Sequence, residues 1–173
     1  KCVRATTDDD FTSVGGFEKA IKNIQTFSDV VWYSPPCTGG SAWQHINYTK
    51  GEETRHKIEE HRILFRNMWE NFERMFQHIE KVGARVVMEL PDCCDYWRDA
   101  RVESFLSKKG FQITTFDGCM HGLQPYGCDD PYKKFWALIM CGVKYDSQNF
   151  DAMQVSGLLP FSFSIGGRIS TTE

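Results

Sequence analysis

Three short segments of the sequence combine reactive or hydrogen-bonding side chains with residues that end β-strands. They are Ser34-Pro35-Pro36-Cys37-Thr38, Glu89-Leu90-Pro91-Asp92 and Asp117-Gly118-Cys119-Met120-His121-Gly122. Each follows a short run rich in β-branched and aromatic residues, which predicts a buried strand. Ligands of open parallel sheets bind beyond the carboxyl ends of the strands, so we expect the three segments to meet on one rim.

Cys37 is the candidate nucleophile of this rim. Two prolines precede it, and their fixed φ angles hold its thiol in place rather than on a floppy loop. A nucleophilic cysteine needs nearby cations or a helix terminus to lower the pKa of its thiol, and an acid or base as partner. Glu89, at the tip of the adjacent strand, is that candidate partner, with its pKa raised by partial burial. The alternative is a cysteine that only fills space under the Pro-Pro turn.

Five further side chains near the same rim are of the types that bind zinc. They are Cys93, Cys94, Cys119, His121 and Cys128. Cys119, His121 and Cys128, together with either Cys93 or Cys94, could form a tetrahedral zinc site that stabilises a small interaction domain. No pair of these cysteines has Cys-x-x-Cys spacing, so reduced buried thiols are the more ordinary interpretation.

Aromatic side chains near the rim are accompanied by lysines. The aromatic residues are Trp32, Tyr33, Trp43, Tyr48, Tyr126 and Tyr132, and the lysines are Lys50, Lys133 and Lys134. Stacking rings interleaved with cations suit a flipped base or a single strand of nucleic acid. The alternative is that Trp32 and Tyr33 belong to the core and that the lysines are ordinary solvated charges.

Alternating periodicities predict the elements that position these residues. We expect helices over residues 17–27, 52–81 and 95–109, and strands over residues 2–6, 30–33, 85–90, 111–116 and 135–141. Strand–helix–strand order predicts an α/β fold, a mostly parallel sheet with helices on both faces. The last two strands have no helix between them, so the final strand should return antiparallel to its neighbour.

The strongest periodic signal belongs to the helix over residues 52–81. Its apolar side chains keep to one stripe: Ile58, Phe65, Met68, Trp69, Phe72, Met75, Phe76 and Ile79. Such a stripe predicts a helix that covers a sheet, and Gly83 supplies its stop.

The order of elements and motifs over residues 28–142 resembles the second half of the catalytic domain of cytosine-C5 methyltransferases. It also resembles methyltransferase-like segments of mobile-element polyproteins. The matching positions are Cys37 in SPPCTGGS, Glu89 in VVMELP, and Lys133 and Lys134 in PYKKFWALIM. The segment FDGCMHGLQPYG resembles the loop that precedes the basic motif of this family.

The resemblance implies a fold, a reaction and a cofactor. The fold would be a three-layer Rossmann-like methyltransferase-type sheet, mostly parallel with an antiparallel last strand. Cys37 would attack C6 of cytosine, Glu89 would contact N3 and the exocyclic amine, and Lys133 or Lys134 would assist the cysteine. The methyl donor would be S-adenosylmethionine, and the partner DNA or RNA. The substrate-binding residues would be Ser34, Pro35, Pro36, Thr38, Ser41, Asp117 and Gly122.

Two departures from the family keep a second interpretation open. The glycine-rich turn that binds S-adenosylmethionine should precede everything visible here, and Gly15-Gly16 is a poor substitute for it. The family's Glu-Asn-Val is Glu-Leu-Pro in this chain. The alternative is therefore a catalytically degenerate methyltransferase-fold module that serves in binding or scaffolding.

Length and composition set the outer limits of these hypotheses. The chain has 173 residues, 41% of them hydrophobic, which predicts a globular α/β domain over residues 1–143 and an irregular extension over residues 144–173. A net charge of −3 gives no general basic field, and the longest apolar run is too short to cross a membrane. Seven cysteines, an odd number, favour reduced thiols in a cytoplasmic or nuclear protein. The start at Lys1 suggests a processed product or a piece of a longer protein.

Overall fold

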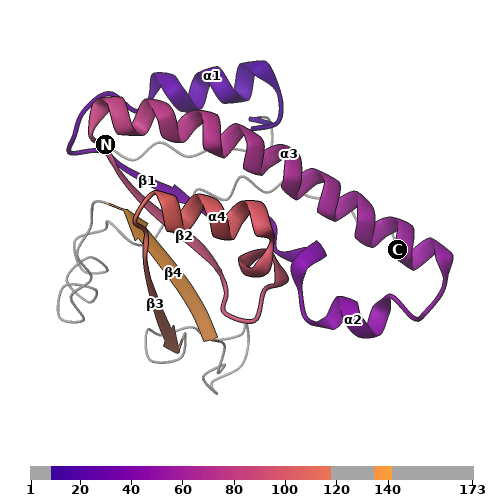
Figure 1. Cartoon of the computed structure of the whole chain (residues 1–173). Helices are drawn as coiled ribbons and strands as arrows, with labels where there is room; N and C mark the ends of the chain where they lie inside the picture. Colours follow the sequence, from indigo (N-terminus) through magenta and orange to yellow (C-terminus); the bar gives the residue numbers. More distant parts are fainter. Residues whose placement is uncertain (1–8, 118–134, 142–173) are drawn as a thin grey trace, which may run out of the picture.

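The computed structural model describes residues 9–117 and 135–141 (Figure 1). The predicted strand over residues 2–6 and the extension over residues 144–173 lie outside these ranges. The described residues form a mixed α/β structure in which helices pack on a sheet.

Among the described residues, four strands form a sheet in the order β1-β2-β4-β3. Their bounds are Val30–Tyr33 (β1), Arg85–Pro91 (β2), Gln112–Asp117 (β3) and Phe135–Cys141 (β4). Strands β1 and β2 pair in parallel, and β4 is antiparallel to both β2 and β3. The predicted antiparallel last strand next to its predecessor is therefore confirmed.

Strand β4 is inserted between two strands that run in the same direction. Because β4 pairs with β2 on one side and with β3 on the other, β1, β2 and β3 all point one way. Pro91 and Phe116 are both in register with Trp136, so β2 and β3 end at the same edge. Strand β2 runs one residue further than predicted and includes Pro91, which is tolerated at a strand end.

The longest helix, α3 (Glu52–Val82), agrees with its prediction to within one residue. Gly83 ends it in the left-handed conformation, with φ of 75°, where a side chain would be strained. Helix α1 (Val14–Lys22) begins earlier than predicted because the Ser13 side chain caps it and accepts the Gly16 N–H. No helix of the described residues is long and apolar enough to cross a membrane.

The helix predicted over residues 95–109 is confirmed only in its second part. The structure has a 3-10 turn, η2 (Asp95–Arg98), followed by the helix α4 (Ala100–Lys108). Asp99 separates them, because its backbone is extended and its carboxylate caps α4 by accepting the N–H groups of Arg101 and Val102. The segment after Cys37, where no helix was predicted, contains a 3-10 turn, η1 (Thr38–Gly40), and the short helix α2 (Trp43–Asn47).

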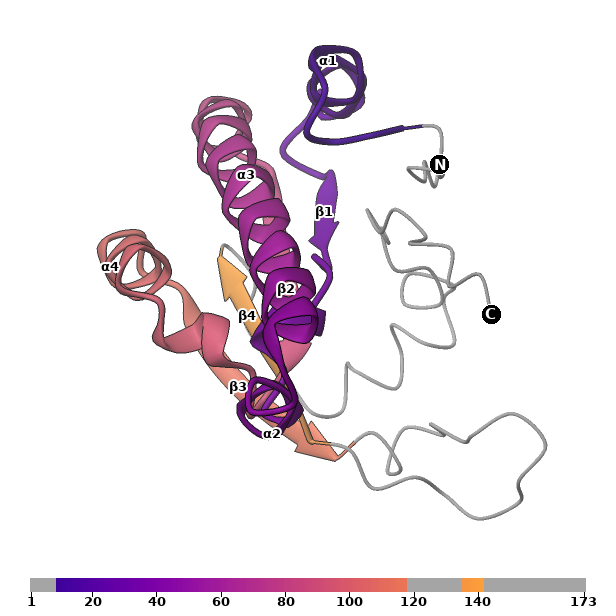
Figure 2. The ribbon, with the colours of Figure 1, turned by 90° about the vertical axis from the view of Figure 1, so that its right-hand side faces the viewer.

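The core lies between α3, α4 and one face of the sheet. Tyr33 of β1 is fully buried and stacks on Phe72 of α3, with ring centroids 4.4 Å apart. Val86, Met88 and Leu90 of β2 point into the same cluster. Figure 2 shows α3 and α4 on the same side of the strands, and α1 packs against α3. Among the described residues, two of the three predicted layers are therefore present.

Candidate functional site

Glu89 lies on the face of β2 that points away from the helices. Its neighbours Met88 and Leu90 enter the core, so the alternation of a strand directs the Glu89 carboxylate to the opposite face. The Glu89 Oε2 atom accepts a hydrogen bond of 3.0 Å from the indole Nε1 of Trp32. The Ser34 hydroxyl lies 3.4 Å from the same oxygen. Two residues from the end of β1 thus hold a half-buried carboxylate at the end of β2.

The register of the sheet explains this contact. Trp32 is paired with Val87, so its long side chain reaches diagonally toward the carboxyl end of β2. Ser34 lies two residues after Trp32 and shares its face. A carboxylate held in this way can accept the amino group of a ligand or, when protonated, donate to a ring nitrogen. This chemistry fits the edge of a nucleobase.

Cys37 occupies a different position from Glu89. It precedes η1, and its carbonyl oxygen accepts the Gly40 N–H at 3.1 Å. Its half-buried thiol packs against the hydrophobic core, which lies on the helix side of the sheet. Hydrogen bonds thus join Glu89 to Trp32 and Ser34, whereas the Cys37 thiol packs against the core.

The turn η1 needs its two glycines, because it lies so close to Tyr96 that a side chain at either position would not fit. A Cβ atom on Gly40 would stand 2.9 Å from the ring of Tyr96, and one on Gly39 would overlap the Tyr96 hydroxyl and lie 2.9 Å from the Cβ of His61. The Thr-Gly-Gly of SPPCTGGS thus allows this turn to lie directly on an aromatic ring. The motif has a packing role besides any role in chemistry.

Tyr96 joins the turn after β2 to α3. Its ring stacks on that of Phe65 with centroids 3.6 Å apart, and its hydroxyl donates to the His61 carbonyl at 3.5 Å. Burial raises the pKa of Tyr96 above its usual value, so it stays a neutral phenol. Arg62 donates from its Nε to the Gly39 carbonyl at 3.2 Å. Sequence reasoning missed Tyr96; its signal was a large aromatic residue in a short connection between a strand and a helix.

The other predicted substrate-binding residues lie along the same connection. Pro35 is buried, Pro36 and Ser41 are half-buried, and Thr38 is exposed. The Thr38 carbonyl accepts the Gln44 side-chain amide at 2.9 Å, which ties α2 to η1. Asp117 ends β3, in register with Phe135. The remaining candidates, Lys133, Lys134 and Gly122, lie outside the described residues.

The cysteines of the predicted zinc site differ in exposure. Cys93 is exposed, whereas Cys94 is buried, and burial raises the pKa of the Cys94 thiol to about 12. In the part of the chain that the structure describes, no three histidine, cysteine or acidic residues are grouped to hold a metal. Cys119, His121 and Cys128 lie outside that part, so the zinc site stays a prediction.

The glycine pair near the start of the described chain does not fit a cofactor-binding turn. Gly16 donates its N–H to Ser13, and its Cα lies so close to the Asp10 carbonyl that a side chain would overlap it. Gly15 has open space around its Cα. The pair serves the start of α1, and no residue described here is assigned to S-adenosylmethionine.

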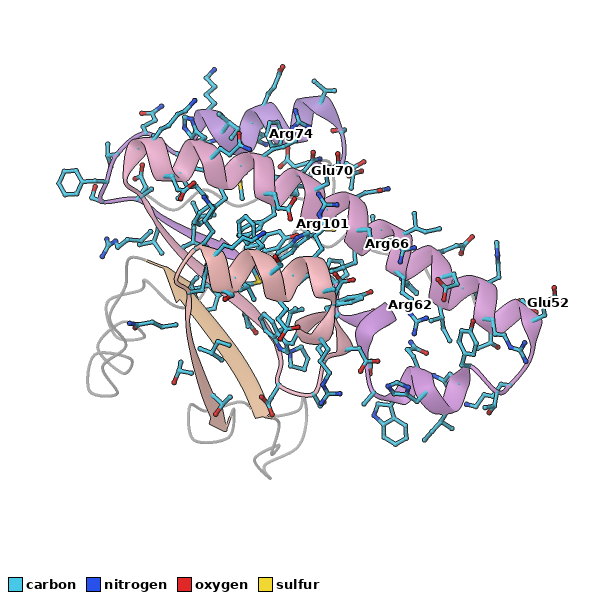
Figure 3. All side chains as sticks on the ribbon, viewed as in Figure 1. Glu52, Arg62, Arg66, Glu70, Arg74 and Arg101 are labelled. Atoms are coloured by element: carbon cyan, nitrogen blue, oxygen red, sulfur yellow. The ribbon has the colours of Figure 1, made fainter. Side chains whose placement is uncertain are left out.

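The aromatic residues near the rim divide into buried and exposed ones. Tyr33 is core, as the alternative interpretation expected, and its ring is out of reach of a base. Trp32, which that interpretation also placed in the core, is half-buried and lies outside the core cluster. Trp43 is 71% exposed on α2, and Tyr48 at its end is 39% exposed. Arg62 extends from α3 toward α2, with its guanidinium 5.7 Å from the Tyr48 ring (Figure 3). Tyr126 and Tyr132 lie outside the described residues.

Comparisons with known proteins identify no family for this chain. No family model matches it, and no match is found among the curated proteins or the solved structures.

Proposed function

We propose that this chain is a methyltransferase-like domain of the cytosine-C5 type that acts on a base of DNA or RNA. Glu89 is its base-contacting acid, Cys37 its nucleophile, and S-adenosylmethionine its methyl donor. The observation that carries the proposal is the Glu89 carboxylate, held by Trp32 and Ser34 at the carboxyl edge of a parallel strand pair. This edge is where an open α/β sheet places its ligands.

The sheet supports the proposal as well. Its parallel pair and antiparallel last strand agree with the arrangement that the resemblance implies. Helices cover one face of the described strands, which accounts for two layers. The third layer, and with it the complete three-layer Rossmann-like sheet, is part of the proposal.

The chemistry of the site follows from cytosine itself. Its N3 accepts a hydrogen bond and its exocyclic amine donates one, so a protonated Glu89 can contact both with its two oxygens. Donation to N3 withdraws electrons from the ring and favours addition of the Cys37 thiolate at C6. Formation of the S–C6 bond moves a π-electron pair toward C5, which could then take the methyl group of S-adenosylmethionine. Loss of the C5 hydrogen as a proton and elimination of the Cys37 thiolate from C6 would restore the base. Lys133 and Lys134 are the proposed cations near the thiolate.

A second candidate function is a binding module of the same fold without catalysis. The observation that favours it is the half-buried Cys37 thiol, which packs against the core. In this module Glu89 would still contact a base, and Cys37 would only support η1.

Calorimetric titration with S-adenosylmethionine separates the two functions. The enzyme should bind the cofactor with a saturable signal and transfer its methyl group to a cytosine-containing single strand. The matched variant Cys37→Ser should bind the cofactor and the strand but transfer no methyl group. A protein that binds the strand but gives no heat with the cofactor would be the binding module, and the proposal of an enzyme would be wrong.

A further inference from the structure

Trp32 contacts Glu89 in a way that constrains the carboxyl group. The indole N–H only donates, so its 3.0 Å hydrogen bond requires an unprotonated acceptor at Oε2. The Ser34 hydroxyl reaches the same oxygen from the next position on that face. Trp32 lies on β1 and Ser34 directly follows that strand, whereas Glu89 lies on β2, so the parallel pairing of the two strands fixes the geometry.

We infer that Trp32 is a positioning residue that fixes the orientation of the Glu89 carboxyl before any ligand arrives. A proton on this carboxyl is directed to Oε1, because the indole N–H occupies Oε2. A site with its hydrogen-bonding groups already in place binds more tightly than one that must order them. The consequence for a ligand rests on the proposed function: the proton on Oε1 would donate to N3, which is an acceptor in cytosine but carries a hydrogen in uracil, so the site should prefer cytosine.

A second tryptophan–glutamate pair provides an internal reference. The Trp69 Nε1 donates to Glu73 Oε1 at 2.9 Å, but this pair joins two turns of α3 and also involves Arg101. Trp69 and Glu73 lie on α3, which packs on the face of the sheet opposite to the one that carries Glu89. A substitution at Glu89 should therefore leave the environment of the Trp69 indole unchanged.

The indole N–H resonances of the full chain test the positioning directly. The variant Trp32→Phe assigns the Trp32 resonance, because it removes one signal and keeps an aromatic ring. The variant Glu89→Gln should then shift the Trp32 resonance, since a neutral amide replaces the carboxylate acceptor, and should leave the Trp69 resonance in place. An unmoved Trp32 resonance in Glu89→Gln would overturn the inference, whether or not the protein binds a base.

Binding of a short thymidine strand with one central cytosine tests the consequence. Against the same strand with thymine at that position, the wild type should prefer cytosine, and Trp32→Phe should lose about tenfold of this preference. Trp97→Phe is the matched control and should keep it, because it removes an indole N–H that donates to the Pro91 backbone carbonyl. An unchanged preference in Trp32→Phe would overturn the selectivity. If the wild type binds neither strand, the proposed function fails, while the resonance still decides the positioning.

Discussion

Gly40 lies so close to Cys94 that a Cβ atom on the glycine would stand 2.8 Å from the Cys94 Sγ. This contact joins the connection after β1 to the connection after β2 at the edge where Glu89 also lies. The His45 Nε2 atom lies 2.8 Å from the Asp95 Oδ2 atom, and this contact links the same two connections through α2 and η2. The edge is thus a packed structure, and its integrity can be tested separately from its chemistry.

Gly40→Ala should destabilise the fold. The new methyl group would meet both the Cys94 sulfur and the Tyr96 ring, which are buried, so one of them must move. Overpacking of this kind costs about 1–3 kcal/mol of unfolding free energy. Gly15→Ala is the matched control, because nothing lies within 4 Å of its new Cβ and alanine favours the helix. Equal stability of the two variants in urea would show that η1 does not lie on Tyr96.

Phe72→Ala should remove the central contact between α3 and the sheet. Phe72 is fully buried and stacks on Tyr33, so the substitution leaves a cavity in the core. We expect it to lower the unfolding free energy by about 3–5 kcal/mol. Trp43→Ala, at a side chain that is 71% exposed, should change the unfolding free energy by less than about 0.5 kcal/mol. Thermal unfolding of both variants checks this; a small effect at Phe72 would contradict the observed core.

The described thiols should differ in their rate of alkylation near neutral pH. Cys94 should react only after unfolding, since burial raises its pKa to about 12 and keeps it protonated. As the proposed nucleophile, Cys37 should react before Cys93, although Cys93 is the more exposed thiol. Mass spectrometry of partly alkylated protein gives the order. A Cys37 that reacts only with the unfolded chain would be a packing residue, as the binding module requires.

Asp29 should make the stability of the fold depend on pH in the acid range. Its carboxylate accepts the backbone N–H groups of Gln25 and Thr26, each at 2.8 Å, and these bonds hold its pKa below the usual 3.8. A pKa lowered by folding contributes stability above the unfolded value, which is lost as the pH falls through the folded value. The difference in unfolding free energy between wild type and Asp29→Asn should therefore be largest near neutral pH and shrink below pH 3.8. A difference that does not vary with pH would contradict this.

Long periodic patterns predicted the fold well because burial enforces them. The stripe of α3 and the strand of β1 lie where the sequence indicates, since both are defined by side chains that must leave water. The break at Asp99 was missed because the apolar positions Val102, Phe105 and Leu106 define only α4, and the prediction extended the helix backward from them through polar residues. The backbone at Asp99 is extended, and its carboxylate caps α4.

The candidate site was predictable in its residue types but not in its contacts. Strand ends indicated Glu89 and Ser34, and the structure joins them. Trp32 was seen as an aromatic residue near the rim, yet its hydrogen bond depends on the strand register, which a single sequence does not specify. The close packing of η1 on Tyr96 likewise depends on tertiary contacts between segments far apart in the chain.

Exchange of the cytosine C5 hydrogen with solvent tests the central claim most directly, because it needs only the residues of this chain. Addition of the Cys37 thiolate at C6 lets C5 take a deuteron from heavy water; loss of the original hydrogen and of the thiolate then restores the base. The wild type should accelerate this exchange in a cytosine-containing single strand. Cys37→Ser should abolish it, and Glu89→Gln should slow it by about 100-fold or more. Exchange no faster with the wild type than with Cys37→Ser would contradict the account.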